Sequence, residues 1–186
     1  ALQGLRDKGE IKSGHKVLIY GASGGVGTFA VQIAKSFGAE VTGVCSTRNV
    51  EILRSIGADH IIDYTEDDLA QHKERYDLVL GVNGSNSISA YKRVLKLNGK
   101  FVHVGGSESQ LYQTLFLGPF ISLTGSRKIS SLLQRANQKD LNDVKELLEI
   151  GKVKPIIDKR FKLSEITEAF KYFQEGHAQG KVVITL

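Results

Sequence analysis

The chain has 186 residues, 41% of them hydrophobic, which is enough for one domain with a real core. No apolar run reaches membrane-spanning length and no signal peptide is visible, and the formal charge of +5 is spread along the chain rather than clustered with aromatic residues. These features argue against membrane and nucleic-acid partners, and the excess of positive charge either serves an anionic small ligand or has no functional meaning. The single Cys45 excludes an internal disulfide and predicts a reducing, cytoplasmic location.

The first elements in chain order predict a strand–turn–helix–strand unit. Residues 2–11 read as a leading helix, and Lys16–Tyr20 as a short buried strand. A helix follows from Thr28, with apolar residues on one face, and Gly38 ends it before a strand over Glu40–Cys45. The length and order of these elements are those of a βαβ unit.

The later elements continue the alternation of strands and helices. They are helices over 50–56, 87–95, 130–150 and 164–176, a polar helical turn over 67–72, and strands over 60–63, 76–80, 100–104, 121–125 and 181–185, with Asn98-Gly99 as a turn. This order predicts an α/β fold, a doubly wound parallel sheet (Rossmann fold) with helices on both faces. We expect residues 1–186 to form a single dinucleotide-binding domain, with 1–14 as leading helix and linker.

The turn between the first strand and the first helix carries the sequence Gly21-Ala-Ser-Gly-Gly-Val-Gly27. A dinucleotide pyrophosphate binds such a turn because backbone N–H groups and the positive end of the helix dipole face the phosphates. Gly24 and Gly27 stand where a side chain would block the ligand or the helix–strand contact. A purely structural glycine turn is the alternative.

The end of the second predicted strand indicates which dinucleotide binds. NAD sites place an acidic residue there to hold the ribose 2′-hydroxyl, but this chain has Ser46, Thr47 and Arg48 and no carboxylate. Arg48 would pair with a 2′-phosphate, which favours NADP(H) as the cofactor, the alternative being that Arg48 is a solvated surface charge. Asn83-Gly84 and Gly105-Gly106 are either nucleotide contacts or simple turns.

The sequence lacks the motifs of several other kinds of active site. No Tyr is followed four residues later by Lys, and there is no Gly-Lys-Ser/Thr phosphate loop. The five histidines show no metal-ligand spacing, so no metal site is predicted and each histidine is expected on the surface or in a loop. Cys45 is expected to be a buried, inert thiol.

Three motifs in register resemble the medium-chain dehydrogenase/reductase superfamily, in its quinone oxidoreductase-like branch, also called zinc-type alcohol dehydrogenase-like. They are residues 21–27, the run Gly57-Ala-Asp-His-Ile-Ile-Asp-Tyr64, and the terminal Gly176-His-Ala-Gln-Gly-Lys-Val-Val-Ile184. The resemblance implies pyrophosphate contacts at Ser23, Gly24, Gly25 and Val26, 2′-phosphate contacts at Ser46, Arg48 and Tyr64, and ribose and nicotinamide contacts at Asn83, Val104, Gly105 and Gly106. Many relatives have a Lys near the position of Arg48.

The resemblance covers part of the family architecture, which joins a GroES-like catalytic domain to a nucleotide domain. The catalytic domain, with most substrate contacts and any zinc ligands, has no counterpart here, so the catalytic residues are not identified. The chain lacks Met and starts at Ala1, which indicates a removed initiator or a piece of a longer protein. We expect the NADPH-binding domain of an oxidoreductase that passes hydride to a quinone, enone or carbonyl substrate. A non-catalytic nucleotide-binding or sensing module that acts through partners is the alternative.

The apolar segment over residues 115–124 bears on association. Pro119 suits an edge strand or a loop, and an apolar edge strand invites a partner strand. The resembling family dimerises by joining sheets at the corresponding edge. We therefore predict a homodimer through the strand from Ile121 to Gly125, the alternative being that this strand lies inside the core.

Overall fold

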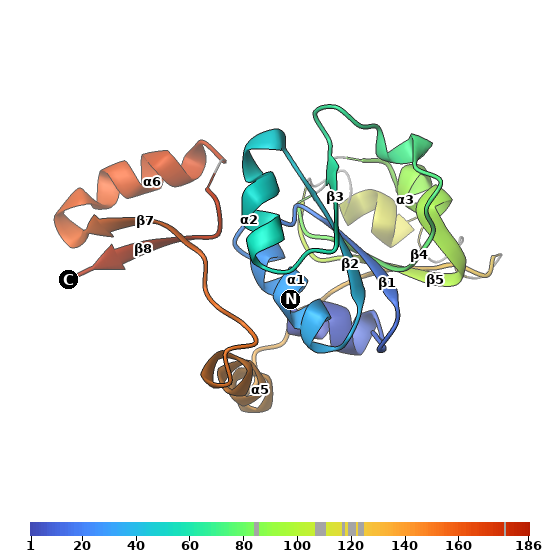
Figure 1. The fold of residues 1–186 in the computed structure, drawn as a ribbon, viewed down its shortest axis with the longest axis horizontal. Helices are drawn as coiled ribbons and strands as arrows, with labels where there is room; N and C mark the ends of the chain where they lie inside the picture. Colours follow the sequence, from blue (N-terminus) through green and yellow to red (C-terminus); the bar gives the residue numbers. More distant parts are fainter. Residues whose placement is uncertain (84–85, 107–110, 117, 119–121, 123–124, 177) are drawn as a thin grey trace.

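The protein folds around a parallel β-sheet (Figure 1). The computed structural model describes residues 1–186 except 84–85, 107–110, 117, 119–121, 123–124 and 177. Among the described residues the sheet has six strands in the order β3-β2-β1-β4-β5-β6. Their bounds are β1 Lys16–Tyr20, β2 Glu40–Cys45, β3 His60–Asp63, β4 Tyr76–Gly81, β5 Leu95–His103 and β6 Lys128–Ser131. The predicted α/β class with a parallel sheet is confirmed.

The order of the strands reverses at β1. β1 pairs with β2 on one side, Lys16 opposite Glu40, and with β4 on the other, Val17 opposite Leu78. The chain winds outward from β1 to β3 and then crosses back to β4. Ligands of open parallel sheets bind at such a switch point, beyond the carboxyl ends of the strands.

Each face of the sheet is covered by helices, as expected for a doubly wound fold. Alternating residues of β1 point to opposite faces, so that Val17 and Ile19 belong to one apolar cluster and Leu18 and Tyr20 to another. The first cluster is closed by the short π-helix η1 (Gly4–Lys8) and by α1 (Gly27–Ser36) and α2 (Val50–Ser55). The second is closed mainly by α3 (Ile88–Val94), whose Tyr91 ring stacks on Phe101 of β5 at 4.6 Å between centroids.

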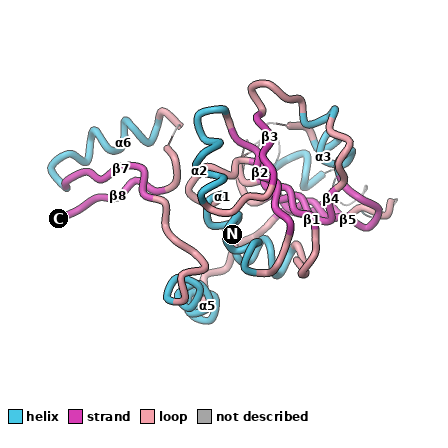
Figure 2. The backbone as a smooth tube through the Cα atoms, in the orientation of Figure 1, coloured by secondary structure: helices cyan, strands magenta, loops and turns pink. Residues whose placement is uncertain are grey.

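The C-terminal third forms an arm beside the sheet (Figures 1 and 2). α5 (Gln138–Glu149) leads into a separate two-stranded parallel sheet of β7 (Ile157–Lys162) and β8 (Lys181–Thr185), with α6 (Ile166–Gln174) between them. The predicted last strand therefore exists, but it pairs with β7 and not with the main sheet. β7 was not predicted, because its sequence IDKRFK is mostly charged and only partly buried.

Three further predictions about elements need correction. The helix expected over 130–150 is wrong at its start: Ser130 and Ser131 belong to β6, and α5 begins after Asn137, whose side chain accepts a hydrogen bond from the Asp140 N–H. The expected turn at Asn98-Gly99 lies inside β5, where Asn98 takes a φ of 65° and the strand continues.

The third correction concerns the predicted edge strand. Ile121 lies outside the described residues, while Gly125 is in a bend and Ser122 is not in a strand. The edge strand of the described sheet is instead β6, which is short and largely polar and therefore lacks the apolar signature on which the prediction depended.

Candidate nucleotide site

The glycine turn has the geometry that close backbone packing requires. Gly21 leaves β1 with a φ of 78°, in the left-handed region that favours glycine. A Cβ on Gly27 would collide with the carbonyl oxygen of Gly21 and with the backbone of Ala22, so Gly27 must be glycine for α1 to sit against the turn. A Cβ on Gly24 would meet only the Gly21 oxygen, at 3.6 Å, because Gly24 faces open space.

The N-terminus of α1 presents free donors at this turn. Val26 is the N-cap residue of α1 and no side chain caps the helix. Within the described part of the chain, the N–H groups of Gly25 and Val26 have no hydrogen-bond acceptor. Two unpaired N–H groups and the positive end of the ten-residue helix α1 form a site that suits a phosphate group.

The turn lines a pocket of about 570 Å³ at the carboxyl ends of β1, β2 and β4. Seven of the predicted cofactor residues line it, namely Ser23, Gly24, Gly25, Val26, Arg48, Tyr64 and Asn83. Segments far apart in the sequence thus meet at the switch point of the sheet.

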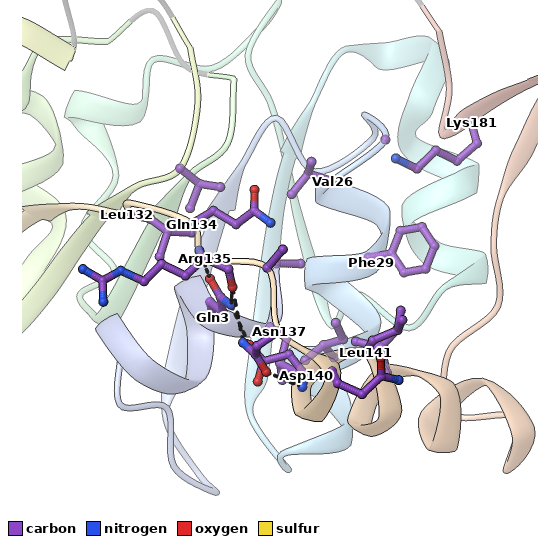
Figure 3. A pocket seen from close by; sticks show the side chains of 18 residues that line it. Gln3, Val26, Phe29, Leu132, Gln134, Arg135, Asn137, Asp140, Leu141 and Lys181 are labelled. Carbon is purple, nitrogen blue, oxygen red and sulfur yellow. Dashed lines mark hydrogen bonds between the residues drawn. The ribbon is translucent and has the colours of Figure 1, made fainter.

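The other predicted residues lie around this pocket rather than in it. Ser46 lines a smaller pocket of about 330 Å³ together with Thr47, Arg48 and Tyr64. Val104 lines a hollow of about 840 Å³ between α1 and α5, drawn in Figure 3. Gly105 and Gly106 line none of these three pockets.

The smaller pocket has a hydroxyl-rich, cationic lining. Ser46, Thr47 and Tyr64 supply hydroxyl groups, Arg48 supplies the charge, and no carboxylate is among its described lining residues. The nearby Asp63 accepts hydrogen bonds from Thr47, which lines this pocket, and from Thr65, whose backbone nitrogen and Oγ1 donate to its Oδ1 at 2.9 and 2.7 Å. Hydrogen bonds from Thr47 and Thr65 lower the pKa of Asp63.

Asn49, which the sequence analysis missed, connects the parts of the site. It is 6% exposed, and its Nδ2 donates to Ser23 Oγ at 2.9 Å and to Ser46 Oγ at 3.2 Å. Its Oδ1 accepts a hydrogen bond of 2.6 Å from Gln179 Nε2. Asn49 stands at the start of α2, where it resembles a helix cap, but its side chain makes no cap bond there.

Lys181 is a second residue that the sequence analysis missed. The Gly180 N–H donates to the Ser23 carbonyl at 3.0 Å, which brings the C-terminal segment onto the glycine turn. Lys181 lines both the 570 Å³ pocket and the neighbouring hollow, with Nζ 5.8 Å from the Phe29 ring centroid. In Figure 3 its ammonium group lies beside Phe29 and Val26, so it adds a positive charge next to the turn.

Two titratable residues near the site are held neutral by burial. Burial, and secondarily Asp63, raises the pKa of Cys45 to about 11, so the thiol stays protonated at neutral pH, in line with the expected buried, inert group. Burial lowers the pKa of His103. The expectation that His103 lies on the surface or in a loop is wrong, because it is the last residue of β5 and 6% exposed.

The described residues contain no group of three or more His, Cys, Asp or Glu side chains placed to hold a metal ion. None of their helices is long and apolar enough to cross a membrane.

A glycine turn between a buried strand and a helix, at the switch point of a parallel sheet, defines a Rossmann-like fold. Comparison with known proteins agrees: residues 56–184 match the zinc-binding dehydrogenase family, and the chain belongs to that family. The resemblance to the medium-chain dehydrogenase/reductase superfamily is thereby confirmed.

Individual relatives cover nearly all of this chain. It is 37% identical to "NAD(P)H oxidoreductase RTN4IP1, mitochondrial" of Bos taurus, over 98% of this chain and 50% of that protein. It is 36% identical to "Quinone-oxidoreductase QR1, chloroplastic" of Triphysaria versicolor, over 93% of this chain and 54% of that protein. The solved quinone oxidoreductase from Coxiella burnetii superposes with a TM-score of 0.85 at 30% identity, over 100% of this chain and 56% of that one. The chain thus spans about half the length of the relatives it matches.

Proposed function

We propose that this chain is the NADP(H)-binding domain of an oxidoreductase that transfers hydride to a quinone, enone or carbonyl compound. The observation that carries the proposal is the pocket of Ser46, Thr47, Arg48 and Tyr64, which joins a fixed cation to three hydroxyl groups and no carboxylate. The names of the relatives, NAD(P)H oxidoreductase and quinone oxidoreductase, support the reaction class.

The glycine turn, the two pockets beside it and the residues after β4 and β5, together called the nucleotide crevice, match successive parts of the cofactor. The N–H groups of Gly25 and Val26 would bind the pyrophosphate, with the α1 dipole and the Lys181 ammonium adding to the positive potential. Arg48 would pair with the 2′-phosphate, helped by the Ser46 and Tyr64 hydroxyls. Asn83, Val104, Gly105 and Gly106, which follow β4 and β5, are proposed for the ribose and nicotinamide end.

The reaction depends on the cofactor for its chemistry. A bound nicotinamide supplies the hydride at C4, and the protein's part is to orient it and exclude water. Among the described residues, the titratable side chains that line the pocket belong to Tyr20, Cys45, Arg48, Tyr64 and Lys181, and Cys45 is held as a neutral thiol. We therefore propose that substrate contacts and any general acid come from the part of the relatives that this chain does not span.

Three further features belong to this proposal. Residues 1–186 act as one dinucleotide-binding domain, the partner is a small-molecule substrate, and the compartment is the cytoplasm. The relatives named mitochondrial and chloroplastic make organelles the alternative compartments.

A binding and turnover assay tests the proposed function. We expect NADPH fluorescence to change on titration with this chain, while NADPH oxidation with a panel of quinones and enones stays at background. Turnover by this chain at ordinary enzyme rates, about 1–10³ per second, would contradict the assignment of substrate contacts. Absence of NADPH binding would contradict the whole proposal. A full-length protein that binds NADPH but oxidises it with no acceptor would favour the non-catalytic module.

A further inference from the structure

A second basic hollow lies on the α3 side of the molecule, away from the glycine turn. It has a volume of about 460 Å³ and is lined by Arg75, Ser89, Lys92, Arg93 and Arg127. Among the residues that the structure describes, no carboxylate lines it. None of its four cationic side chains forms an ion pair with another residue in the described part of the chain.

The topology of the sheet gathers these charges from three segments. Arg75 directly precedes β4 and Arg127 precedes β6, and these parallel strands flank β5, so both arginines lie at the amino ends of the strands. α3 runs back toward the same end and carries Lys92 and Arg93 in its last turn. The glycine turn lies at the opposite, carboxyl end of the sheet. The two hollows share no residue.

Two of the guanidinium groups are held in place by the backbone. Arg75 Nη1 donates to the carbonyl oxygens of His72, Lys73 and Glu74 at 2.9, 2.8 and 2.9 Å. Arg127 Nε donates to the Leu95 carbonyl at 3.0 Å. A guanidinium has five N–H donors, so each arginine keeps donors for a ligand while its orientation is fixed.

Four unpaired positive charges around one hollow raise the local potential and repel one another. The dipole of α3 favours cations in its last turn, which accounts for Lys92 and Arg93 but not for the arginines that come from outside the helix. An oxyanion with several acceptor oxygens would relieve the repulsion, and arginine forks match phosphate oxygens in geometry. Ser89, one turn before Arg93 on α3, adds a hydroxyl group.

We propose that this hollow binds a phosphate-bearing small molecule, at a site separate from the nucleotide crevice and independent of it in function. The hollow is small and its donors converge from three segments, which suits a compact phosphate or diphosphate group rather than an extended acidic chain.

The test is a titration of the chain with inorganic pyrophosphate, followed by amide NMR shifts and by calorimetry. Arg48→Ala is used as the background to remove the cation of the 2′-phosphate pocket, and amide shifts at Gly25 and Val26 report separately on pyrophosphate bound at the glycine turn. We expect shifts at Arg75, Lys92, Arg93 and Arg127, and an affinity that falls as sodium chloride is added. Arg93→Gln and Arg127→Gln should each weaken binding at least tenfold.

Arg54→Gln is the matched control, because it removes the same charge from α2, where Arg54 pairs with Glu51 at the surface. Its affinity for pyrophosphate should be unchanged. Shifts confined to the glycine turn, an equal loss in Arg54→Gln, or tighter binding of poly-glutamate than of pyrophosphate would each overturn the proposal. Arg93 is exposed and makes no hydrogen bond to a described side chain, so Arg93→Gln should fold normally and keep the test decisive.

Discussion

Asn49 and Gln179, 130 positions apart in the sequence, are joined by a hydrogen bond of 2.6 Å from Gln179 Nε2 to Asn49 Oδ1. The amide nitrogen of the same Asn49 donates to Ser23 in the glycine turn. The buried Asn49 side chain therefore reinforces the direct bond from the Gly180 N–H to the Ser23 carbonyl, and together they keep Lys181 beside Gly25.

The first prediction follows from this connection. Asn49→Ala should weaken NADPH binding about tenfold, because losing a buried polar partner costs roughly 1–3 kcal/mol and frees the segment that carries Lys181. Hydrogen exchange at Gly180 and Lys181 should become faster in the same variant.

Gln179→Ala is the control for this prediction, since it removes the hydrogen bond from Gln179 to Asn49 and leaves the bonds from Asn49 to Ser23 and Ser46 intact. Its effect on NADPH affinity should be smaller than that of Asn49→Ala. If Asn49→Ala binds NADPH as well as the unmodified chain does, Asn49 has no positioning role.

The second prediction separates two glycines of the same turn. Gly27→Ala should lower the free energy of unfolding by about 1–3 kcal/mol, because the added methyl group meets the backbone of Gly21 and Ala22. Gly24→Ala should leave the melting temperature nearly unchanged and weaken NADPH binding, since its methyl group would enter open space in the pocket. Thermal melts and NADPH titrations measure both effects, and the reverse pattern would show that the turn has been assigned wrongly.

The elements that could be predicted from the sequence are those whose pattern of apolar residues matches the face that the fold buries. The first βαβ unit, the strands β3 and β4, and the Ser87-capped α3 all combine apolar periodicity with a clear start or stop signal. β6 and β7 were missed because each is short or charged and only partly buried, so their strand structure depends on pairing with distant segments.

In the candidate site, too, some residues could be predicted from local sequence and others depend on distant contacts. The glycine turn and the Ser46–Arg48 region are contiguous in sequence and could be predicted from their chemistry. Asn49 and Lys181 depend on the return of the C-terminal segment over the turn, a contact across more than a hundred residues that no local pattern indicates. Asn49 could be read only as a helix cap.

A third prediction concerns acid stability. Hydrogen bonds from Gln3, Arg6 and Asn137 lower the pKa of Asp140 from 3.8 to about 2. The ionised form is thus favoured in the folded state, so its contribution to stability is complete above pH 3.8 and is lost as the pH falls toward about 2.

Asp140→Asn should therefore lower the melting temperature at pH 7, and the difference from the unmodified chain should shrink toward pH 2. Asp143→Asn, which removes a single more exposed partner of Arg6, is the control. If the melting temperatures of Asp140→Asn and the unmodified chain differ by the same amount from pH 7 to pH 2, the Asp140 charge does not have this role.

The fourth prediction concerns a homodimer, now proposed through β6. Ile129 N–H points away from β5 and binds Ser122 Oγ at 3.0 Å, whereas the Leu132 N–H points inward to His103. Because these directions alternate along a strand, the Ser131 N–H faces the open edge. A second copy would pair there and displace Ser122.

Ser131→Pro removes that outward N–H without taking a bond from the β5–β6 ladder, so it should convert a dimer into a monomer in light scattering while the fold is kept. Ser131→Ala keeps the N–H and should stay dimeric. A chain that is monomeric from the start at micromolar concentration, or a dimer that persists in Ser131→Pro, would contradict pairing through β6.

Arg48 and its neighbours are proposed to select a 2′-phosphate, and calorimetric titration of NADPH and NADH tests this selection most directly. Losing a charged hydrogen bond costs about 1.5–3 kcal/mol, so we expect the unmodified chain to bind NADPH roughly ten- to a hundredfold more tightly than NADH. Arg48→Ala should bring the two affinities together by weakening NADPH alone, and Arg54→Ala should leave their ratio unchanged. Equal affinities for NADPH and NADH in the unmodified chain would contradict the account.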